Sequence, residues 1–407
     1  MLQTLFTLAI RNLWRQPRRS ALAIAAVSFG IVALMLASGF IEWIFFDMRE
    51  STIRSQIGHL QVVRPGYLEA GPSDLASHLL PGAGPELAVL AREPQVRIVA
   101  ARLSFSGLAS HGETTVSFLG EGVDPKHEPE LSKALDIVQG QRLPDDDPNT
   151  VLLGVGLAAN LGAKIGDRIV VVVNKPTGGI SAAELRVTGL FATITKAYDD
   201  TALRLPIATA RKLLHLQGAH RWIMLLDDTS STDAAARALD AKLPRDRYQV
   251  VRWHELADFY QKTVALFSRQ VQVVKIIIAS IIVLGIGNTL TMCVMERTGE
   301  IGTSMALGTR RRAVLAQFVT EGALLGIIGG ALGVALGMVL AIAISHVGIP
   351  MPPPPGMAHG FIGQIRITPT LALEAFALAV TATLFASLYP AWKASRLVIV
   401  DALRTNR

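Results

Sequence analysis

Two long apolar runs without a charged residue constrain this chain more than any other feature. The first covers residues 276–295 and the second residues 322–345, with a charged loop between them. An uncharged run of about 18 residues or more is typical of a helix that crosses a bilayer, because about 20 helical residues span a hydrocarbon core of about 30 Å. A helix also satisfies its own backbone polar groups in lipid. The two runs therefore predict a pair of membrane-spanning helices.

Composition and the placement of positive charge also indicate a membrane protein. The chain is 50% hydrophobic and 17% charged, whereas soluble domains carry about 25% charged residues. The net charge is +7, and basic residues flank the apolar runs, as they do on the cytoplasmic side of membrane proteins. This placement argues against a nucleic-acid partner. The flanking residues are Arg11, Arg15, Arg18, Arg19, Arg310, Arg311, Arg312, Lys393 and Arg396.

The same reasoning divides the rest of the chain. Residues 1–17 have apolar positions at helical spacing beside arginines, which predicts a cytoplasmic amphipathic helix. The uncharged run that follows is longer than the apolar core of a signal peptide, which favours a retained helix over a cleaved one. Transmembrane helices are expected at 18–41, 271–295, 313–345 and 371–392, a short periplasmic loop at 346–370, and a cytoplasmic tail at 393–407.

Residues 42–270 have a different character, with most of the acidic residues and segments rich in Val and Ile between Gly, Pro and Asp. That pattern is typical of strands. A proline- and aspartate-rich stretch at 139–150 is the expected boundary between two lobes. The predicted fold class is a membrane α-helical protein with four transmembrane helices and a large α+β extracytoplasmic domain between helices 1 and 2. Strands are expected at 57–63, 97–103, 114–119, 168–173, 184–190, 223–226 and 249–252, and helices at 85–92, 156–161, 207–216 and 232–243.

No constellation of residues in the sequence indicates catalysis. It contains no G-x-x-x-x-G-K-[ST] loop for nucleotide phosphates, no G-x-S-x-G and no H-x-x-x-H pair. Gly154 and Gly156 follow an apolar strand, but Ala159 takes the third position of a dinucleotide loop, which favours a plain turn into a helix. The single cysteine, Cys293, excludes an intrachain disulfide. We expect a non-catalytic subunit with no metal and no directly bound cofactor.

Five glycines repeat along the second apolar run at spacings of three and four residues. Such spacing places them on one helical face, where they let another helix approach closely. Either that helix belongs to the same subunit, or the stripe is a subunit contact or a surface that slides during transport. Glu321 precedes the stripe, and we interpret it as a carboxylate that contacts another helix. The glycines are Gly322, Gly326, Gly330, Gly333 and Gly337.

The loop at 296–312 combines both signs of charge with an apolar spacing that predicts a short helix ended by glycine. A short helix at the cytoplasmic surface is well placed to dock on a soluble partner. The alternative is that the arginines at 310–312 only fix the topology, which leaves the acidic and apolar residues unexplained. The candidate docking residues are Glu296, Arg297, Glu300, Ile301, Met305, Leu307 and Gly308.

These residues resemble the signature of ABC-transporter permeases of the MacB, LolC/LolE and FtsX group. The resemblance rests on E-R-T-G-E-I-G at 296–302, M-A-L-G at 305–308 and Y-P-A-W-K-A-S-R at 389–396. In the inserted domain, L-G-V-G-L-A at 153–158 and L-G-A-K-I-G-D at 161–167 resemble the periplasmic domain of that group. The length of the chain and Gly58-His59-Leu60 favour the LolC/LolE branch over MacB, which has a fused ATPase. After the first span, lipoprotein-releasing permeases have an Asn-Gly-Phe stretch. This chain has Ser38-Gly39-Phe40 there, so Ser38 departs from the pattern of that branch.

The resemblance implies a permease subunit of the bacterial inner membrane with a large periplasmic domain. Its partners would be a cytoplasmic ABC ATPase dimer, on which ATP and Mg²⁺ bind, and a second permease subunit, identical or homologous. Membrane lipids and a lipoprotein or periplasmic partner complete the expected set. The expected work is extraction or export of lipoproteins or other amphiphiles. The alternative is an FtsX-like signalling subunit that activates a periplasmic partner such as a cell-wall hydrolase.

A lipid-like cargo would enter between the first two spans at the depth of the outer leaflet. Bulky apolar side chains at that depth suit acyl chains, since each buried CH₂ contributes about 0.8 kcal/mol. The alternative is that these residues simply face bulk lipid. The candidate contacts are Leu36, Phe40, Ile41, Val274, Ile277, Ile278 and Ile281.

The positive-inside pattern predicts that both termini lie in the cytoplasm and residues 42–270 outside it. A cysteine placed at Ser230 should therefore react with a membrane-impermeant reagent added to the extracytoplasmic side. Labelling of that cysteine only from the cytoplasm would contradict the predicted topology.

Overall fold

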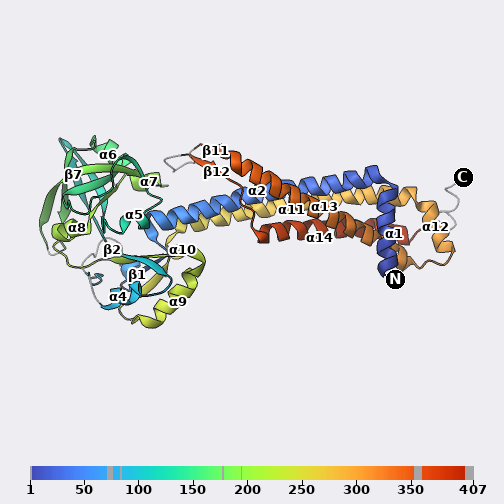
Figure 1. Cartoon of the computed structure of the whole chain (residues 1–407), viewed down its shortest axis with the longest axis horizontal. Helices are drawn as coiled ribbons and strands as arrows, with labels where there is room; N and C mark the ends of the chain where they lie inside the picture. The colour runs from blue at the N-terminus through green and yellow to red at the C-terminus, as the bar shows by residue number, and fades with distance from the viewer. Residues whose placement is uncertain are drawn as a thin grey trace. The chain divides into compact units, whose positions relative to one another are not determined.

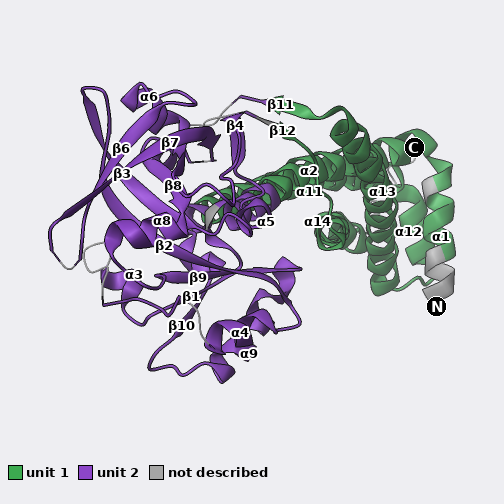
Figure 2. Cartoon of the chain, turned by 60° about the vertical axis from the view of Figure 1, so that its left-hand side comes forward, with its two compact units in different colours: residues 1–45, 263–350, 362–407 green, residues 46–262, 351–361 purple. Residues whose placement is uncertain are grey.

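The computed structural model describes residues 2–70, 77–82, 85–176, 178–193, 195–352 and 360–398, with the side chains of residues 2–6, 13, 56 and 361 left aside. Residues 353–359 of the expected 346–370 loop and residues 399–407 of the expected tail lie outside these ranges. The chain forms two compact units, coloured separately in Figure 2. Unit 1 is Met1–Phe45, Thr263–Pro350 and Ile362–Arg407, and unit 2 is Phe46–Lys262 and Met351–Phe361.

Unit 1 is helical, and its elements can be followed by their labels in Figure 1. Among the described residues, α2, α11, α13 and α14 are the four helices long and apolar enough to cross a membrane, which confirms the predicted helical class. The short strands β11 (Ile349–Met351) and β12 (Phe361–Gly363) pair in the connection before α14. The helices are α1 (Leu2–Arg15), α2 (Pro17–Thr52), α11 (Asp258–Glu296), α12 (Thr298–Ala306), α13 (Arg311–Val347) and α14 (Pro369–Ser395).

The helices α2 and α11 extend well beyond their apolar runs. α2 continues to Thr52 past Glu42 and Asp47, and α11 begins at Asp258. Glu, Gln, Lys and Arg are good helix formers, so the charged residues end the apolar run without ending the helix. Hydropathy therefore marks the depth of a residue in the bilayer and not the end of its helix.

The core of unit 1 joins all four long helices, with Leu325 as the buried contribution of α13. Val27, Ile31 and Leu34 of α2 are buried against Ile286 of α11 and Ala379 of α14. Small residues along α14 leave room for the branched side chains opposite them, which is the interlocking that close packing requires.

α13 lies against α14 at glycines. A Cβ built on Gly322 would lie 2.5 Å from Ser387 Cβ, and one built on Gly326 would lie 2.1 Å from Thr383 Oγ1. Gly330 faces the same helix. In lipid, helices associate through close van der Waals contact between small residues, so these three positions hold the pair together.

The remaining glycines of the stripe meet a different helix. A Cβ on Gly333 would lie 2.8 Å from Ile31 Cβ, and one on Gly337 would lie 3.0 Å from Met35 Sδ, both in α2. Gly329, outside the expected stripe, also faces α2. The glycine stripe therefore meets two helices, α14 and α2, and not the single helix expected, and its contacts lie within this chain.

Unit 2 is an α+β domain around a ten-stranded mixed sheet, inserted between α2 and α11 as predicted. The strand order is β10-β1-β9-β2-β3-β8-β5-β7-β4, with β6 pairing to β2 and β7. The strands are β1 (Leu60–Val63), β2 (Val96–His111), β3 (Thr114–Val123), β4 (Asp136–Gly140), β5 (Thr150–Gly154), β6 (Arg168–Asn174), β7 (Ile180–Ala192), β8 (Ala202–Pro206), β9 (Arg221–Leu226) and β10 (Gln249–Arg252).

Helices cover this sheet and connect its strands. They include every helix expected in this part of the sequence. The helical elements are η1 (Ile53–Ile57), α3 (Tyr67–Ala70), α4 (Pro85–Ala91), α5 (Glu128–Leu131), α6 (Val155–Leu161), α7 (Lys196–Asp199), α8 (Ile207–Leu214), η3 (Thr229–Ser231), α9 (Thr232–Lys242) and α10 (Trp253–Leu256).

Strand β2 runs through two lobes. Its first half pairs with β9 and its second half with β3 and β6. One apolar core gathers Leu60, Trp222 and Leu239, and another gathers Phe118 and Val151 with their neighbours. The lobe boundary expected at 139–150 is wrong, because residues before and after that loop share the second core.

Buried charges join the strands near the middle of β2. Arg102 Nη1 donates to Glu121 at 2.8 Å, and Arg102 Nη2 donates to Glu128 at 2.9 Å. Arg204 Nη1 donates to the same Glu128 at 2.6 Å and to Ser132 Oγ at 2.9 Å. Buried charges are tolerated when they are paired and hydrogen-bonded, and here each carboxylate is shared by more than one arginine.

The same cluster of charged residues also contacts η1, the helical turn that directly follows α2. Arg204 Nη2 donates to the carbonyl of Ser55 in η1 at 2.9 Å, and Arg221 donates to Glu121 at 2.5 Å. Burial alone would raise the pKa of Glu121, but the charges of Arg102, Arg221 and Arg204 outweigh it and lower the pKa to about 2. Glu121 therefore stays ionised at any physiological pH.

Gly326 gives a test of the helix packing. Gly326→Leu should separate α13 from α14 and cost about 1–3 kcal/mol or more, because the new side chain would overlap Thr383. Thermal unfolding and size-exclusion profiles in detergent measure the effect. The matched control is Gly285→Leu on α11, where an added Cβ meets nothing within 4 Å. Equal behaviour of the two variants would contradict the packing role.

His59 gives a test of the domain by pH. Its Nδ1 accepts from the Leu226 N–H at 3.0 Å and its Nε2 lies 3.0 Å from Thr229 Oγ1, and burial lowers its pKa to about 4. The unfolded chain, with a His pKa of about 6.5, binds the proton first. Stability is therefore full above pH 6.5 and falls as the pH drops toward 4.

The decrease in the free energy of unfolding that His59 causes at low pH should reach about 2–3 kcal/mol. Urea unfolding of the full chain in detergent, followed by tryptophan fluorescence at pH 7 and pH 4.5, measures it against His59→Gln, which lacks the titration. An identical pH slope in both proteins would rule out this role for His59.

Candidate functional site

The candidate docking segment forms the short helix α12 between α11 and α13. The Gly308 N–H donates to the Met305 carbonyl at 3.0 Å, and Gly308 has a φ of +100°, so glycine ends the helix as the sequence predicts. Ile301 and Met305, one turn apart, face inward. They are buried with Phe318 of α13 and Ala391 of α14. One side of α12 is thereby fixed to the helix bundle.

The two apolar residues expected to meet a partner have opposite environments. Met305 is 8% exposed and belongs to the core of this chain, whereas Leu307 is 84% exposed. We therefore assign Met305 to holding α12 in place and retain Leu307 as the apolar residue available for docking. α12 is thus anchored to the bundle on one side, while Leu307 at its end is open.

Ion pairs tie α12 and the end of α11 to the first two helices. Arg19 pairs with Glu296, and Gln16 donates to the same carboxylate at 3.3 Å. Arg15 Nη1 lies 3.8 Å from Glu300 Oε2. Exposed pairs of this kind contribute about 0.2–1 kcal/mol each, so they orient the segment more than they stabilise it.

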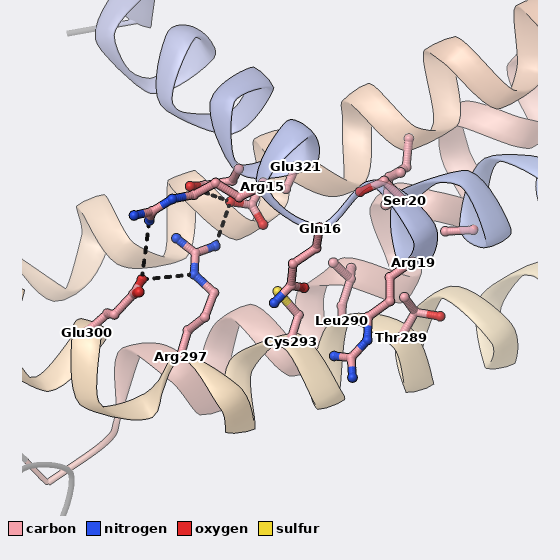
Figure 3. Close-up of a pocket in the computed structure, with 13 residues that line it drawn as sticks. Arg15, Gln16, Arg19, Ser20, Thr289, Leu290, Cys293, Arg297, Glu300 and Glu321 are labelled. Atoms are coloured by element: carbon pink, nitrogen blue, oxygen red, sulfur yellow. Dashed lines mark hydrogen bonds and ion pairs between the residues drawn. The ribbon is translucent and has the colours of Figure 1, made fainter. Parts of the chain in front are cut away.

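A second set of bonds joins α12 to α13. Arg297 lies 3.4 Å from both Glu300 and Glu321, and Asn12 of α1 donates to Glu321 at 2.5 Å. Figure 3 shows Arg15 and Arg297 both directed at Glu300, with Glu321 beyond Arg297. The Glu321 side chain is almost fully buried, so its two partners satisfy a carboxylate that would otherwise be costly to bury. This confirms Glu321 as a carboxylate that contacts other helices.

These charged groups surround a cavity of about 340 Å³. Its walls come from α1, α2, α11, α12 and α13 (Figure 3). The lining residues include Asn12, Arg15, Gln16, Arg19, Cys293, Arg297, Glu300 and Glu321.

The predicted cargo-contact residues do not form one surface. Val274 and Ile278 face the bundle core, where Ile278 approaches Gly30 of α2, while Ile277 and Ile281 are exposed. The seam between α2 and α11 is thus filled at this depth by the side chains of the chain itself. Only the exposed residues are available to lipid or to another subunit.

The other three candidates lie further along α2. Phe40 stacks on Trp43 with ring centroids 6.4 Å apart, and Phe40 also packs on Gly363, the last residue of β12. Leu36 and Ile41 are half-buried. A role of these residues in cargo contact stays a prediction.

Within the part of the chain that the structure describes, no group of three or more His, Cys, Asp or Glu side chains is placed to hold a metal ion. The geometry thus defines a class of protein: a multi-pass membrane protein with an inserted α+β domain and a short helix fixed between two spans.

Comparison with known families identifies that class. Residues 20–242 match the MacB-like periplasmic core domain, and residues 273–399 match the FtsX-like permease C-terminal domain. The chain belongs to the ABC-transporter permease family that includes MacB, LolC, LolE and FtsX.

Named relatives differ in how much of the chain they cover. An uncharacterized ABC transporter permease of Methanocaldococcus jannaschii is 29% identical, over 51% of this chain and 52% of that protein. The lipoprotein-releasing system transmembrane protein LolE of Haemophilus influenzae is 24% identical, over 78% of this chain and 79% of LolE. The macrolide export ATP-binding/permease protein MacB of Hyphomonas neptunium is 34% identical, over 51% of this chain and 31% of that protein. The chain thus matches about half the length of the first relative and about a third of the last.

Proposed function

We propose that this permease couples ATP hydrolysis on a separate cytoplasmic ABC ATPase dimer to work on lipoproteins or other amphiphiles at the extracytoplasmic side of the inner membrane. The observation that supports it is the two-sided character of α12. Its inner side is fixed by Ile301 and Met305, and Leu307 stands open at its end. A surface with one exposed apolar residue between charged ones suits a protein interface, where an apolar anchor contributes most of the affinity.

The contacts of α12 suggest how movement would spread. Glu300 and Arg297 connect it to Glu321 of α13, and Glu296 connects the end of α11 to Arg19 at the start of α2. A displacement of α12 by the ATPase would therefore act on three membrane helices at once. α2 and α11 are the two helices that lead into the inserted domain, so they are the route by which that domain would respond.

The extent of the alignments supports an amphiphile as cargo. LolE of Haemophilus influenzae and LolC of Neisseria meningitidis, both named for a lipoprotein-releasing system, align over 78% and 80% of this chain, whereas MacB aligns over 51%. We propose that a second permease subunit, identical or homologous, completes the membrane part of the complex. ATP and Mg²⁺ would bind on the ATPase.

Leu307→Asp tests the docking role. The variant should insert and fold normally but bind the ATPase at least about 30-fold more weakly, because losing an apolar anchor costs an interface about 2 kcal/mol or more. Co-purification of the ATPase and its ATP hydrolysis rate measure the effect. The matched control is Val347→Asp, at an equally exposed position (86%) at the other end of α13.

The control should retain the ATPase at the wild-type level. Wild-type association of Leu307→Asp would refute the docking assignment. Normal association with ATP-dependent activation of a periplasmic hydrolase, and no lipoprotein release, would instead establish the signalling alternative.

A further inference from the structure

Ser38 of α2 has a buried hydroxyl that lacks a hydrogen bond. The residue is 6% exposed, and its Oγ has no partner among the described residues. Several other hydroxyls in the long helices bond to a carbonyl, as Ser280 and Thr383 do at 2.8 and 2.9 Å with the carbonyl four residues earlier. Buried polar groups are normally satisfied. An unsatisfied one that faces a cavity therefore points to a ligand that the cavity takes.

Ser38 lines a cavity of about 240 Å³ between α2, α11 and the start of α14. A water occupies about 30 Å³ in the liquid, so the space takes a larger polar group. Lys275 of α11 donates to Glu374 of α14 at 2.6 Å across this cavity. Glu42 of α2 also lines it and has no ion-pair partner in the described ranges. The cavity thus has one more carboxylate than ammonium.

The other end of the cavity suits an anion. α14, a helix of 27 residues, begins there at Pro369, with Thr368 accepting from the Leu371 N–H at 3.2 Å. The N-terminus of a helix favours negative charge, and the Lys275 ammonium adds to it. Thr370 contributes a further hydroxyl. The cavity therefore presents the Glu42 carboxylate with Ser38 on α2, and the Lys275 ammonium with the N-terminus of α14 on its other walls, where Glu374 is the partner of Lys275. A zwitterionic group requires one region of each sign.

The surroundings of the cavity are apolar. Ile276 and Ile277 follow Lys275 along α11, Leu373 precedes Glu374 on α14, and all three are exposed. Exposed apolar side chains beside charged ones on a membrane-spanning helix mark the boundary between acyl chains and headgroups. A molecule with a zwitterionic head and acyl chains could place each part against a matching surface.

The residues that line the cavity favour a ligand with a primary ammonium over one with a quaternary ammonium. Phe45 is the one aromatic residue among those that line this cavity, whereas quaternary ammonium groups are usually held by several aromatic rings. Carboxylates and hydroxyls instead accept hydrogen bonds from N–H donors. We propose that this cavity binds the headgroup of a phospholipid with a primary ammonium, which lies between Glu42 and Ser38 while the phosphate lies toward Lys275 and the start of α14. This inference holds whatever cargo the transporter moves.

Native mass spectrometry of the full chain in detergent tests the proposal with short-chain phosphatidylethanolamine. Binding should be at least about tenfold tighter than that of phosphatidylcholine or phosphatidylglycerol with the same chains. Glu42→Gln and Ser38→Ala should each weaken phosphatidylethanolamine binding several-fold. The matched control Glu113→Gln, an exposed carboxylate of the inserted domain, should leave binding unchanged. No ATPase is present, so the result does not depend on the proposed function.

A second measurement uses the unaltered protein. A carbodiimide should join the lipid amine to Glu42 as an amide, detectable by peptide mass, with phosphatidylethanolamine but not with phosphatidylcholine. Equal retention of all three lipids, tighter binding of phosphatidylglycerol, or absence of the Glu42 adduct would overturn the proposal.

Discussion

Close contact between α13 and its two neighbours holds the membrane part of this protein together. In lipid there is little hydrophobic drive to bring helices together, so association depends on how near two backbones come. Gly322 and Gly326 allow that approach to α14, and Gly333 and Gly337 allow it to α2. Glu321 directly precedes Gly322 on α13, and its carboxylate is buried against Asn12 of α1 and Arg297. The pairs of Glu296 with Arg19 and of Glu300 with Arg15 belong to other elements, so charge adds a second set of links to the glycine packing.

The two ends of unit 1 use charge in different ways. Near α12, acidic and basic side chains pair with one another, so that Glu296, Glu300 and Glu321 each have a basic partner within this chain. Beside Lys275 and Glu374, the carboxylate of Glu42 is left over. Paired charges, as near α12, can hold helices together without binding a ligand. An unpaired charge, as at Glu42, suits a site that binds a ligand of opposite charge.

Much of the fold could be predicted from local pattern alone. The four long helices are recognisable because lipid requires about 20 apolar residues in a row. Seven strands are recognisable by their Val and Ile content, and β5 is recognisable as the apolar run before Gly154. β4 and β8 are not, since β4 is mostly exposed, and β8 contains Arg204, whose buried partners Glu121 and Glu128 are distant in sequence. For the same reason the pattern could not separate Met305 from Leu307. Both are apolar, and only the packing of α13 and α14 decides which one is covered.

The position of β1 has a consequence for how the protein is made. β1 follows the first membrane helix, yet both of its partners, β9 and β10, come from the far end of the inserted domain, with Leu60 opposite Arg252 and Met224. During synthesis β1 therefore emerges long before anything can pair with it. Contacts between such distant segments form slowly, because closing a long loop costs entropy first. The sheet is completed only after β10, shortly before α11, has been synthesised and has reached the side of the membrane where the domain folds. Folding of the domain therefore depends on insertion of the second membrane helix.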